Sequence, residues 1–225
     1  MSKYKILNLY ACLGGNRYKW DEVADIEVTA VELDPELARM YQERFPNDTV
    51  IIADAHQYLL DHYNEFDFIW TSPPCPTHSR ARFWVSSSQE TSLLPVYPDM
   101  NLYQEVIFLT NYFKGKFVVE NVIPFYEPLV PAKKRGRHLY WTNFNLPSVL
   151  STRSFKMSGK SEVKDLCRFH GIAIDSYKGN QRKDKIARNL VDYEAGETIL
   201  QTALGIDRRS VASQISFFDQ VAHTV

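Results

Sequence analysis

Short apolar runs alternate with amphipathic segments along the first half of this chain, and this alternation constrains the fold more than any other feature. Three runs, Lys5–Tyr10, Glu27–Leu33 and Thr49–Ala53, are rich in aliphatic and β-branched residues, as buried strands are. After the second run, Asp34 is suited to cap a helix and Pro35 to occupy its first turn. Strands that alternate with helices predict parallel β-α-β units, which place helices on both faces of one sheet.

The pattern continues toward the C-terminus with more interruptions. Further strands are expected at Phe66–Thr71, Phe117–Val119 and Leu139–Phe144. Helices are expected at Glu36–Phe45, Ala55–Tyr63, Asp99–Phe113 and Glu194–Gly205. Residues 145–190 are polar and basic with weak periodicity, which is typical of a small appended lobe. We therefore predict an α/β fold with a main domain at 1–144, a lobe at 145–190 and a segment at 191–225 that returns to the main domain.

Length and composition bound the class of protein. A chain of 225 residues with 44% hydrophobic residues can bury the core of one domain with a small lobe. Its apolar runs are too short for a membrane span, and its N-terminus lacks the pattern of a signal peptide. Cys12, Cys75 and Cys167 are too widely spaced for a zinc site or a disulfide framework. We expect a cytoplasmic protein without a metal and without a membrane partner.

Charge is distributed unevenly along the chain. Residues 1–130 carry 10 Lys and Arg against 18 Asp and Glu, a balance of −8. Residues 131–225 carry 16 against 9, a balance of +7. A basic second half favours a polyanion as its partner, although exposed cations also serve to keep a small lobe soluble.

Three features at successive strand ends suggest a nucleotide-like cofactor. The turn from Tyr10 to Gly15 is rich in glycine, Glu32 is placed to bind ribose hydroxyls, and Asp54 is placed to accept from an adenine amino group. The missing phosphate-binding fingerprint favours S-adenosylmethionine over a dinucleotide. The candidate cofactor-binding residues are Tyr10, Ala11, Cys12, Leu13, Gly14, Gly15, Glu32, Leu33, Asp54, Ala55 and Pro73.

The segment Ser72-Pro73-Pro74-Cys75 follows an expected strand, and two prolines stiffen the backbone before a cysteine. Such a thiol is placed like a nucleophile, whereas an isolated cysteine is more often a small buried hydrophobe. Another expected strand ends in Glu120-Asn121-Val122. In one α/β sheet, the thiol of Cys75 and the carboxylate of Glu120 could meet over a single substrate.

This order of motifs, followed by Arg135-Gly136-Arg137, resembles the motif series of cytosine-C5 DNA methyltransferases. Short phage and prophage members are the most similar, and the resemblance runs from about Lys5 to Phe144 and returns faintly at Glu197–Asp207. It implies a Rossmann-like sheet that binds S-adenosylmethionine, with helices on both faces. It also implies that residues 145–190 form a small basic target-recognition lobe.

The resemblance implies a role for each catalytic candidate. Cys75 would attack C6 of a cytosine flipped out of the duplex, Glu120 would act at N3, and Arg137 would hold the carbonyl oxygen of the base. Arg135 completes the catalytic set. A positive neighbourhood formed by arginines would favour the thiolate; these arginines are Arg80, Arg82, Arg135 and Arg137.

Double-stranded DNA is the partner that the resemblance implies, and we expect a monomer. The long segment Thr77–Pro98 is expected to be a mobile loop that closes over the target base, with His78 solvated on it. The basic run Gly179–Arg188 suits phosphate contacts, or a solvated helix face. The candidate DNA-binding residues are Ser79, Arg80, Arg82, Arg182, Lys183 and Lys185.

Two positions depart from the family pattern. Lys133 stands where many relatives have glutamine, and the stretch after Ser213-Gln214 lacks the prolines of the usual C-terminal motif. Three other readings stay open. A tRNA-acting branch shares these motifs, which leaves an RNA (tRNA) cytosine-C5 methyltransferase. The altered C-terminus leaves a non-catalytic DNA-binding relative, and the Pro-Pro motif leaves an adenine-N6 methyltransferase, although that family has an aromatic residue where Cys75 stands. The resemblance also suggests a cognate restriction nuclease as a candidate partner, and a bacterial or phage-infected cell as the setting.

Overall fold

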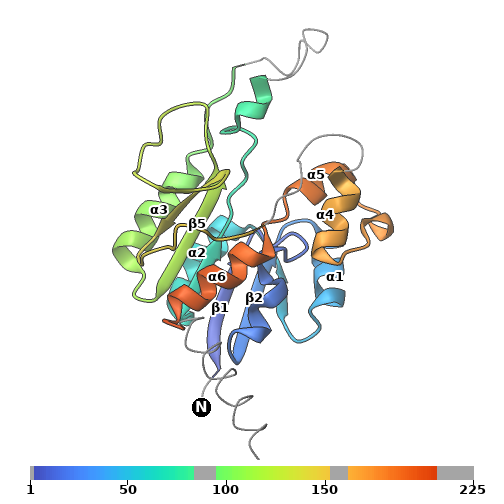
Figure 1. Cartoon of the computed structure of the whole chain (residues 1–225), viewed down its shortest axis with the longest axis horizontal. Coiled ribbons are helices and arrows are strands. Elements are labelled where there is room, and N and C mark those ends of the chain that lie inside the picture. Colours follow the sequence, from blue (N-terminus) through green and yellow to red (C-terminus); the bar gives the residue numbers. More distant parts are fainter. Residues whose placement is uncertain (1–2, 84–94, 153–161, 207–225) are drawn as a thin grey trace, which may run out of the picture.

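The structure, a computed structural model, describes residues 3–83, 95–152 and 162–206. A seven-stranded sheet in the order β3-β2-β1-β4-β5-β7-β6 forms its centre (Figure 1). Five strands are parallel: β1 (Tyr4–Leu9), β2 (Ile26–Glu32), β3 (Thr49–Ile52), β4 (Phe68–Thr71) and β5 (Lys116–Val122). Strand β7 (His138–Thr142) is antiparallel to both of its neighbours, β5 and β6 (Lys133–Arg135).

Helices cover both faces of this sheet (Figure 1). The α-helices are α1 (Pro35–Arg44), α2 (Ala55–His62), α3 (Asn101–Tyr112), α4 (Glu162–His170), α5 (Lys183–Arg188) and α6 (Tyr193–Ala203). The 3-10 helices are η1 (Asn16–Glu22), η2 (Tyr63–Glu65), η3 (Arg80–Phe83) and η5 (Ile174–Ser176). The α/β sheet with helices on both faces is therefore confirmed, and each strand and helix expected from the sequence is present with ends shifted by a few residues.

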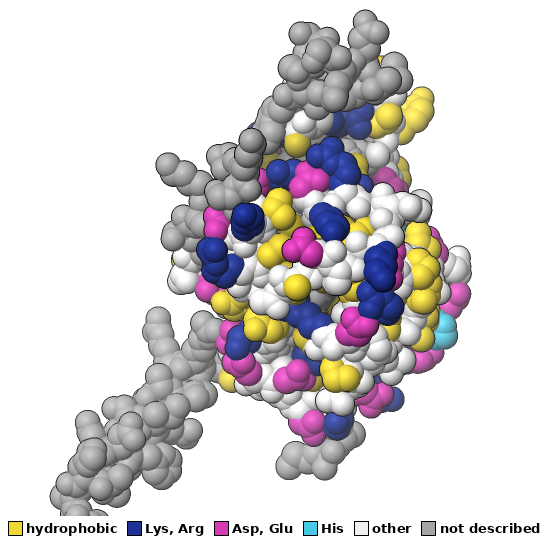
Figure 2. Space-filling model, turned by 90° about the vertical axis from the view of Figure 1, so that its right-hand side faces the viewer, with side chains coloured by type: hydrophobic (Ala, Val, Ile, Leu, Met, Phe, Trp, Pro, Cys, Tyr) yellow, Lys and Arg dark blue, Asp and Glu magenta, His cyan; other side chains and the backbone are white. Residues whose placement is uncertain are grey.

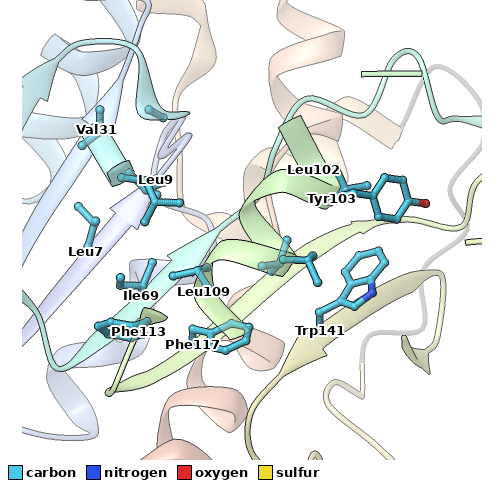
Figure 3. Close-up of a cluster of buried hydrophobic side chains, with 14 of the residues drawn as sticks. Leu7, Leu9, Val31, Ile69, Leu102, Tyr103, Leu109, Phe113, Phe117 and Trp141 are labelled. Atoms are coloured by element: carbon cyan, nitrogen blue, oxygen red, sulfur yellow. The ribbon is translucent and has the colours of Figure 1, made fainter. Parts of the chain in front are cut away.

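The strands bury side chains on both faces, because successive residues of a strand point to opposite sides. In β4, Ile69 packs with α2 and α3, whereas Phe68 and Trp70 face α6 and η1. Figure 3 shows the first of these clusters, in which Leu109 of α3 lies over Ile69 and Phe117. Two apolar faces explain why the central strands are continuous hydrophobic runs.

The start of α1 follows the capping chemistry expected from the sequence. The Asp34 side chain accepts hydrogen bonds from the backbone N–H groups of Glu36 (2.9 Å) and Leu37 (3.3 Å), and Pro35 lies in the first turn. This cap places the N-terminus of α1 directly after Glu32. The local geometry at the end of β2 is thus set by residues adjacent in sequence.

Residues 162–190 form three short helices that pack on the main domain. Leu166, Ile174 and Ile186 are buried in one cluster with Leu13 of the glycine-rich turn and Leu37 of α1. Two further elements were not predicted from the sequence: β6, inside the basic run Lys133–Arg137, and this helical unit. The division of the chain at residues 144 and 190 stays a prediction.

The excess of cations in the second half of the chain does not make the side of α1, α4 and α5 uniformly positive. Figure 2 faces the side of α1, α4 and α5, where basic and acidic side chains are interspersed. Arg188 pairs with Asp184 (2.8 Å) and Glu162 (3.2 Å). Within the described ranges, no helix has the length and apolarity needed to cross a bilayer, and no cluster of side chains could hold a metal ion.

Helix α6 approaches η1 so closely that only glycine fits at position 196. A Cβ atom there would lie 2.1 Å from the carbonyl oxygen of Asn16, and Trp20 donates its indole N–H to the Gly196 carbonyl (3.2 Å). We expect Gly196→Ala to lower the free energy of unfolding by about 2 kcal/mol and the Tm by roughly 4–8 °C, although alanine is the better helix former. Thermal unfolding measures this, with Gln201→Ala in the same helix as control. An unchanged Tm would contradict the close approach.

Candidate active site

The candidate residues meet at one edge of the sheet, where the parallel strands β1 to β5 end. Tyr10 follows β1, Glu32 closes β2, Asp54 follows β3, Cys75 follows β4, and Glu120 lies near the end of β5. Ligands of open α/β sheets bind outside this carboxyl edge. The sheet therefore brings the predicted cofactor and catalytic residues to one side of the molecule.

The glycine-rich turn after β1 has an unusual backbone. Tyr10 and Cys12 have positive φ angles of 55° and 48°, and Gly14 has φ of 65°. A Cβ atom on Gly14 would lie 2.4 Å from the Phe45 ring, and one on Gly15 would lie 2.5 Å from the carbonyl oxygen of Val191. Both glycines are thus required for internal packing. The bent backbone from residue 10 to residue 13 lies at the carboxyl edge of the sheet, directly after β1.

Glu32 joins this turn to the loop after β2. Its carboxylate accepts from the backbone N–H groups of Cys12 (2.8 Å) and Asp34 (2.9 Å). Burial raises the pKa of the carboxyl, and these hydrogen bonds oppose that rise. A carboxylate has about four acceptor sites, so oxygen lone pairs remain for the hydroxyls of a ribose.

Apolar and polar groups suited to an adenine ring lie beside Glu32. Leu33 is 66% exposed and Ile52, opposite Glu32 in the sheet register, is 57% exposed. Asp54 is exposed and caps α2 through one carboxylate oxygen, which accepts from Gln57 N–H (2.9 Å), while Ala55 behind it is buried. Exposed aliphatic side chains next to an acceptor fit S-adenosylmethionine, which presents a flat base and a diol.

The buried carboxylate of Glu105, which the sequence analysis did not single out, holds together the strand ends at this edge. Glu105 of α3 has no exposed side-chain surface, and it accepts from the hydroxyls of Tyr10 (2.6 Å) and Thr71 (2.6 Å). His56 of α2 lies 3.0 Å from it, and this contact raises the pKa of His56. Glu105 thus joins the ends of β1 and β4 to two helices. The sequence did offer one signal for this role: Glu105 lies on the apolar face of the amphipathic helix α3, where a carboxylate needs polar partners.

The loop that carries Cys75 is attached to the end of β5. The side-chain amide of Asn121 donates to the carbonyl oxygen of Pro73 (2.9 Å), and both groups are buried. An isolated β-bridge joins Ser79 to Pro124, and Arg80 donates to the Pro124 carbonyl (2.9 Å). The loop after β4 and the segment after β5 therefore form one unit.

The charges that affect the pKa of the Cys75 thiol are not those of the four arginines that were expected to favour its thiolate. Burial raises the pKa of the Cys75 thiol, and the nearby negative charge of Glu120 raises it further. The side-chain charge that lowers this pKa is that of Lys185, on α5. The chain thus places the thiol and the carboxylate close together, and a lysine from a distant segment provides the positive charge.

The three basic candidates of the β6–β7 hairpin occupy different positions. The Arg135 guanidinium donates to backbone carbonyls, among them those of Leu146 (3.0 Å) and Pro147 (2.5 Å). Arg137 is exposed in the turn beside Gly136, whose φ is 56°. Lys133 donates to the Thr142 hydroxyl (2.7 Å), and burial lowers the pKa of its amine. The exposed Arg137 is therefore the one free to reach a ligand.

The expectation of a solvated His78 is wrong. Its side chain is fully buried, and Nδ1 lies 2.5 Å from the hydroxyl of Tyr126. Burial lowers the pKa of the imidazole, so the ring is neutral near pH 7. The loop also begins with helix η3 rather than with irregular chain, while its middle, residues 84–94, lies outside the described residues.

The candidate DNA-binding residues lie in two groups. Ser79, Arg80 and Arg82 are on the loop after Cys75, and the Ser79 hydroxyl accepts from Ala81 N–H (3.1 Å). The second group is at α5, where Arg182 pairs with Asp184 (2.9 Å) and Lys183 donates to the Asp175 carbonyl (2.8 Å). Lys185 is exposed. The atypical stretch after Ser213 lies outside the described residues.

The sheet, with helices on both faces and polar residues at its carboxyl edge, has the architecture of the α/β methyltransferase fold. The sequence model of the C-5 cytosine-specific DNA methylase family matches residues 4–125, which is more than half of the chain. The chain belongs to this family.

Solved structures with a related fold include DNMT2 of Spodoptera frugiperda, with 24% identity, a TM-score of 0.38, and coverage of 53% of this chain and 36% of that one. A SAM-dependent methyltransferase from Agrobacterium tumefaciens matches with 16% identity, a TM-score of 0.39, and coverage of 56% and 40%. The glycopeptide N-methyltransferase MtfA in complex with S-adenosylmethionine matches with 18% identity, a TM-score of 0.36, and coverage of 65% and 61%. The chain thus spans about a third of the length of DNMT2. No curated protein sequence matches it.

We expect Glu32→Ala to weaken binding of S-adenosylmethionine by about tenfold or more, because hydrogen bonds to a charged acceptor are lost. Affinity of the parent protein is expected to fall as pH falls through the raised pKa of Glu32, since the protonated carboxyl is a poorer acceptor. Isothermal titration calorimetry with the cofactor measures both effects. Glu27→Ala, an exposed glutamate on the same strand, is the control. Equal affinities of the two variants would exclude the ribose assignment.

Alkylation of Cys75 by iodoacetamide is expected to accelerate with pH well above neutrality, because its thiol pKa is raised. Glu120→Gln removes the repelling charge and should speed alkylation at a given pH by about threefold to tenfold. Lys185→Ala should slow it, whereas Lys183→Ala on the same helix should not. Peptide mass spectrometry separates Cys75 from Cys12, whose thiol pKa burial raises to about 12. Identical rates in all variants would contradict the assigned charges.

Proposed function

We propose that the protein methylates C5 of cytosine in double-stranded DNA through a covalent bond between Cys75 and C6 of the base. The observation that carries this proposal is the junction between the Cys75 loop and β5. The Asn121 amide donates to the Pro73 carbonyl (2.9 Å), and the charge of Glu120, after burial, raises the pKa of the Cys75 thiol. A nucleophile and an acid on two adjacent strand ends are the two groups that this chemistry needs.

Cytosine C5 is a poor nucleophile because its electrons are delocalised in the ring. When the Cys75 thiolate adds to C6, the C5–C6 double bond is broken and N3 takes a proton from Glu120. The C5 carbon then has enamine character and is nucleophilic. Arg137, exposed at the β6–β7 turn, is proposed to bind the carbonyl oxygen of the base. Arg135, held on backbone carbonyls, keeps that turn in place.

The chain's own residues would hold the cofactor beside the base. Glu32 would bind the ribose, Leu33 and Ile52 would contact the adenine, and Asp54 would accept from its amino group. Tyr10 and the bent turn after β1 would lie beside the methionine portion. Bound S-adenosylmethionine supplies an electrophilic methyl group to the activated C5 carbon. Loss of the C5 proton then allows the bond between Cys75 and C6 to break.

The target base must leave the stacked duplex to reach a half-buried thiol. Arg80 and Arg82 beside the Cys75 loop, together with Lys185 on α5, are proposed to contact phosphates. The residues between 145 and 190 are proposed to recognise the target sequence. We further propose a role in restriction-modification or in phage defence evasion, in the cytoplasm of a bacterial or phage-infected cell.

The decisive experiment is trapping of the covalent intermediate. Duplex DNA that contains 5-fluorocytosine, incubated with the protein and S-adenosylmethionine, is expected to give a denaturation-resistant complex. Fluorine cannot leave as the C5 proton does, so the bond between Cys75 and C6 persists. Cys75→Ser should lose the complex and at least about 10³-fold in methyl transfer while retaining cofactor affinity.

Parallel reactions with duplex DNA and with tRNA, using labelled cofactor, identify the substrate. Labelling of tRNA alone would replace the DNA proposal with an RNA cytosine-C5 methyltransferase. Absence of a complex with either nucleic acid would favour a non-catalytic relative. Sequencing of methylated cytosines in DNA from expressing cells then gives the target site.

A further inference from the structure

His138 lies beside the carboxylate of Glu120, at a position that the sequence motifs do not mark. In the antiparallel register of β5 and β7, His138 is opposite Val122 and Glu120 is opposite Tyr140. Residues two apart on a strand share a face, so His138 is a diagonal neighbour of Glu120. The Nε2 atom of His138 is 3.6 Å from Oε1 of Glu120.

Two other basic groups of the hairpin are engaged elsewhere, and a third is exposed. Arg135 and Lys133 donate to backbone carbonyls and a threonine hydroxyl, and Arg137 is exposed in the turn. The charge of Glu120 also raises the pKa of the Cys75 thiol, which lies on the loop after β4. Among the described residues, His138 is the side chain able to carry positive charge that lies within 4 Å of this carboxylate.

Because Glu120 and His138 are largely buried, the charge that the pair carries affects its free energy strongly. The side chain of Glu120 is 8% exposed and that of His138 is 25% exposed. A nearly buried carboxylate is costly unless a cation or a proton compensates its charge. A neighbouring imidazole can provide either, because it exchanges a proton near neutral pH.

Resting on the proposed function, we propose that His138 is a positioning residue that shares one proton with Glu120 and supplies to it the proton that passes to N3 when Cys75 adds to cytosine. Before addition, the imidazolium and the carboxylate have no net charge, and the thiolate carries −1. After addition, that one proton has passed through Glu120 to N3, and the pair consists of a neutral imidazole and a carboxylate. The base adduct is neutral and the pair carries −1, so charge and protons balance.

This sharing has a consequence for the pH dependence of the attack. The Cys75 thiolate forms as pH rises, whereas the shared proton is lost as pH rises. The two requirements oppose each other, so the rate of attack should pass through a maximum. Replacing His138 by Gln keeps a polar side chain of similar reach but removes the group that can carry the proton. A merely structural contact would change stability and leave the shape of the pH profile intact.

The test measures addition to C6 without methyl transfer. Duplex DNA carrying tritium at cytosine C5 releases it to water when the enamine forms, is protonated at C5 and reverts. We expect His138→Gln to slow release by about tenfold or more near neutral pH, with a deficit that grows toward higher pH. Added imidazole should restore part of the rate. His62→Gln, which breaks the exposed pair of His62 with Glu65 (2.7 Å), is the matched control.

A second comparison isolates the path through Glu120. In a Glu120→Gln background, His138→Gln should cause no further loss, because the carboxylate that passes the proton of His138 to N3 is already absent. Tm and cofactor affinity of each variant confirm an intact fold. A His138→Gln variant with the parent rate and pH profile would overturn the proton-sharing role and leave the methylation proposal standing. Absence of Cys75-dependent release in the parent protein would overturn both.

Discussion

The hydrogen bond from Asn121 to the carbonyl of Pro73 turns two strand ends into one site. Strands β4 and β5 are parallel neighbours, so their carboxyl ends are adjacent, but adjacency alone does not fix a loop. The buried Pro73 carbonyl needs a donor, and the Asn121 amide provides it at 2.9 Å. The Ser79–Pro124 bridge then fixes the far side of the loop that carries Cys75. The charge of Glu120 at the end of β5 raises the pKa of this thiol.

The same closeness creates an electrostatic conflict. A nucleophile and an acid that meet over one base also repel each other when both are ionised, and burial strengthens that repulsion. Burial and this repulsion by Glu120 together raise the pKa of the Cys75 thiol. The charge of Lys185 lowers the pKa of the thiol, and the imidazole of His138 lies 3.6 Å from the carboxylate. A basic side chain from a different element therefore accompanies each of the two groups.

Features set by neighbours in sequence could be predicted, and features set by distant contacts could not. The strands and the Asp34 cap follow from local pattern, and the capping bonds span two or three residues. Burial of His78 depends on Tyr126, 48 residues away, so composition of its own loop suggested solvent. Strand β6 is three residues long and mostly polar, so its pairing with β7 leaves no periodicity to detect.

Several cations of the basic second half have partners within the described residues. Arg182 and Arg188 are paired with Asp184, and Lys183 and Arg135 are held by backbone carbonyls. The apolar side of α5 packs on Leu13 of the glycine-rich turn, and the charge of its exposed Lys185 lowers the pKa of the Cys75 thiol. Residues 162–190 therefore pack against the carboxyl edge of the sheet. Under the proposed function, DNA in contact with this unit would lie across the same edge as the cofactor, which would link recognition to the position of Cys75.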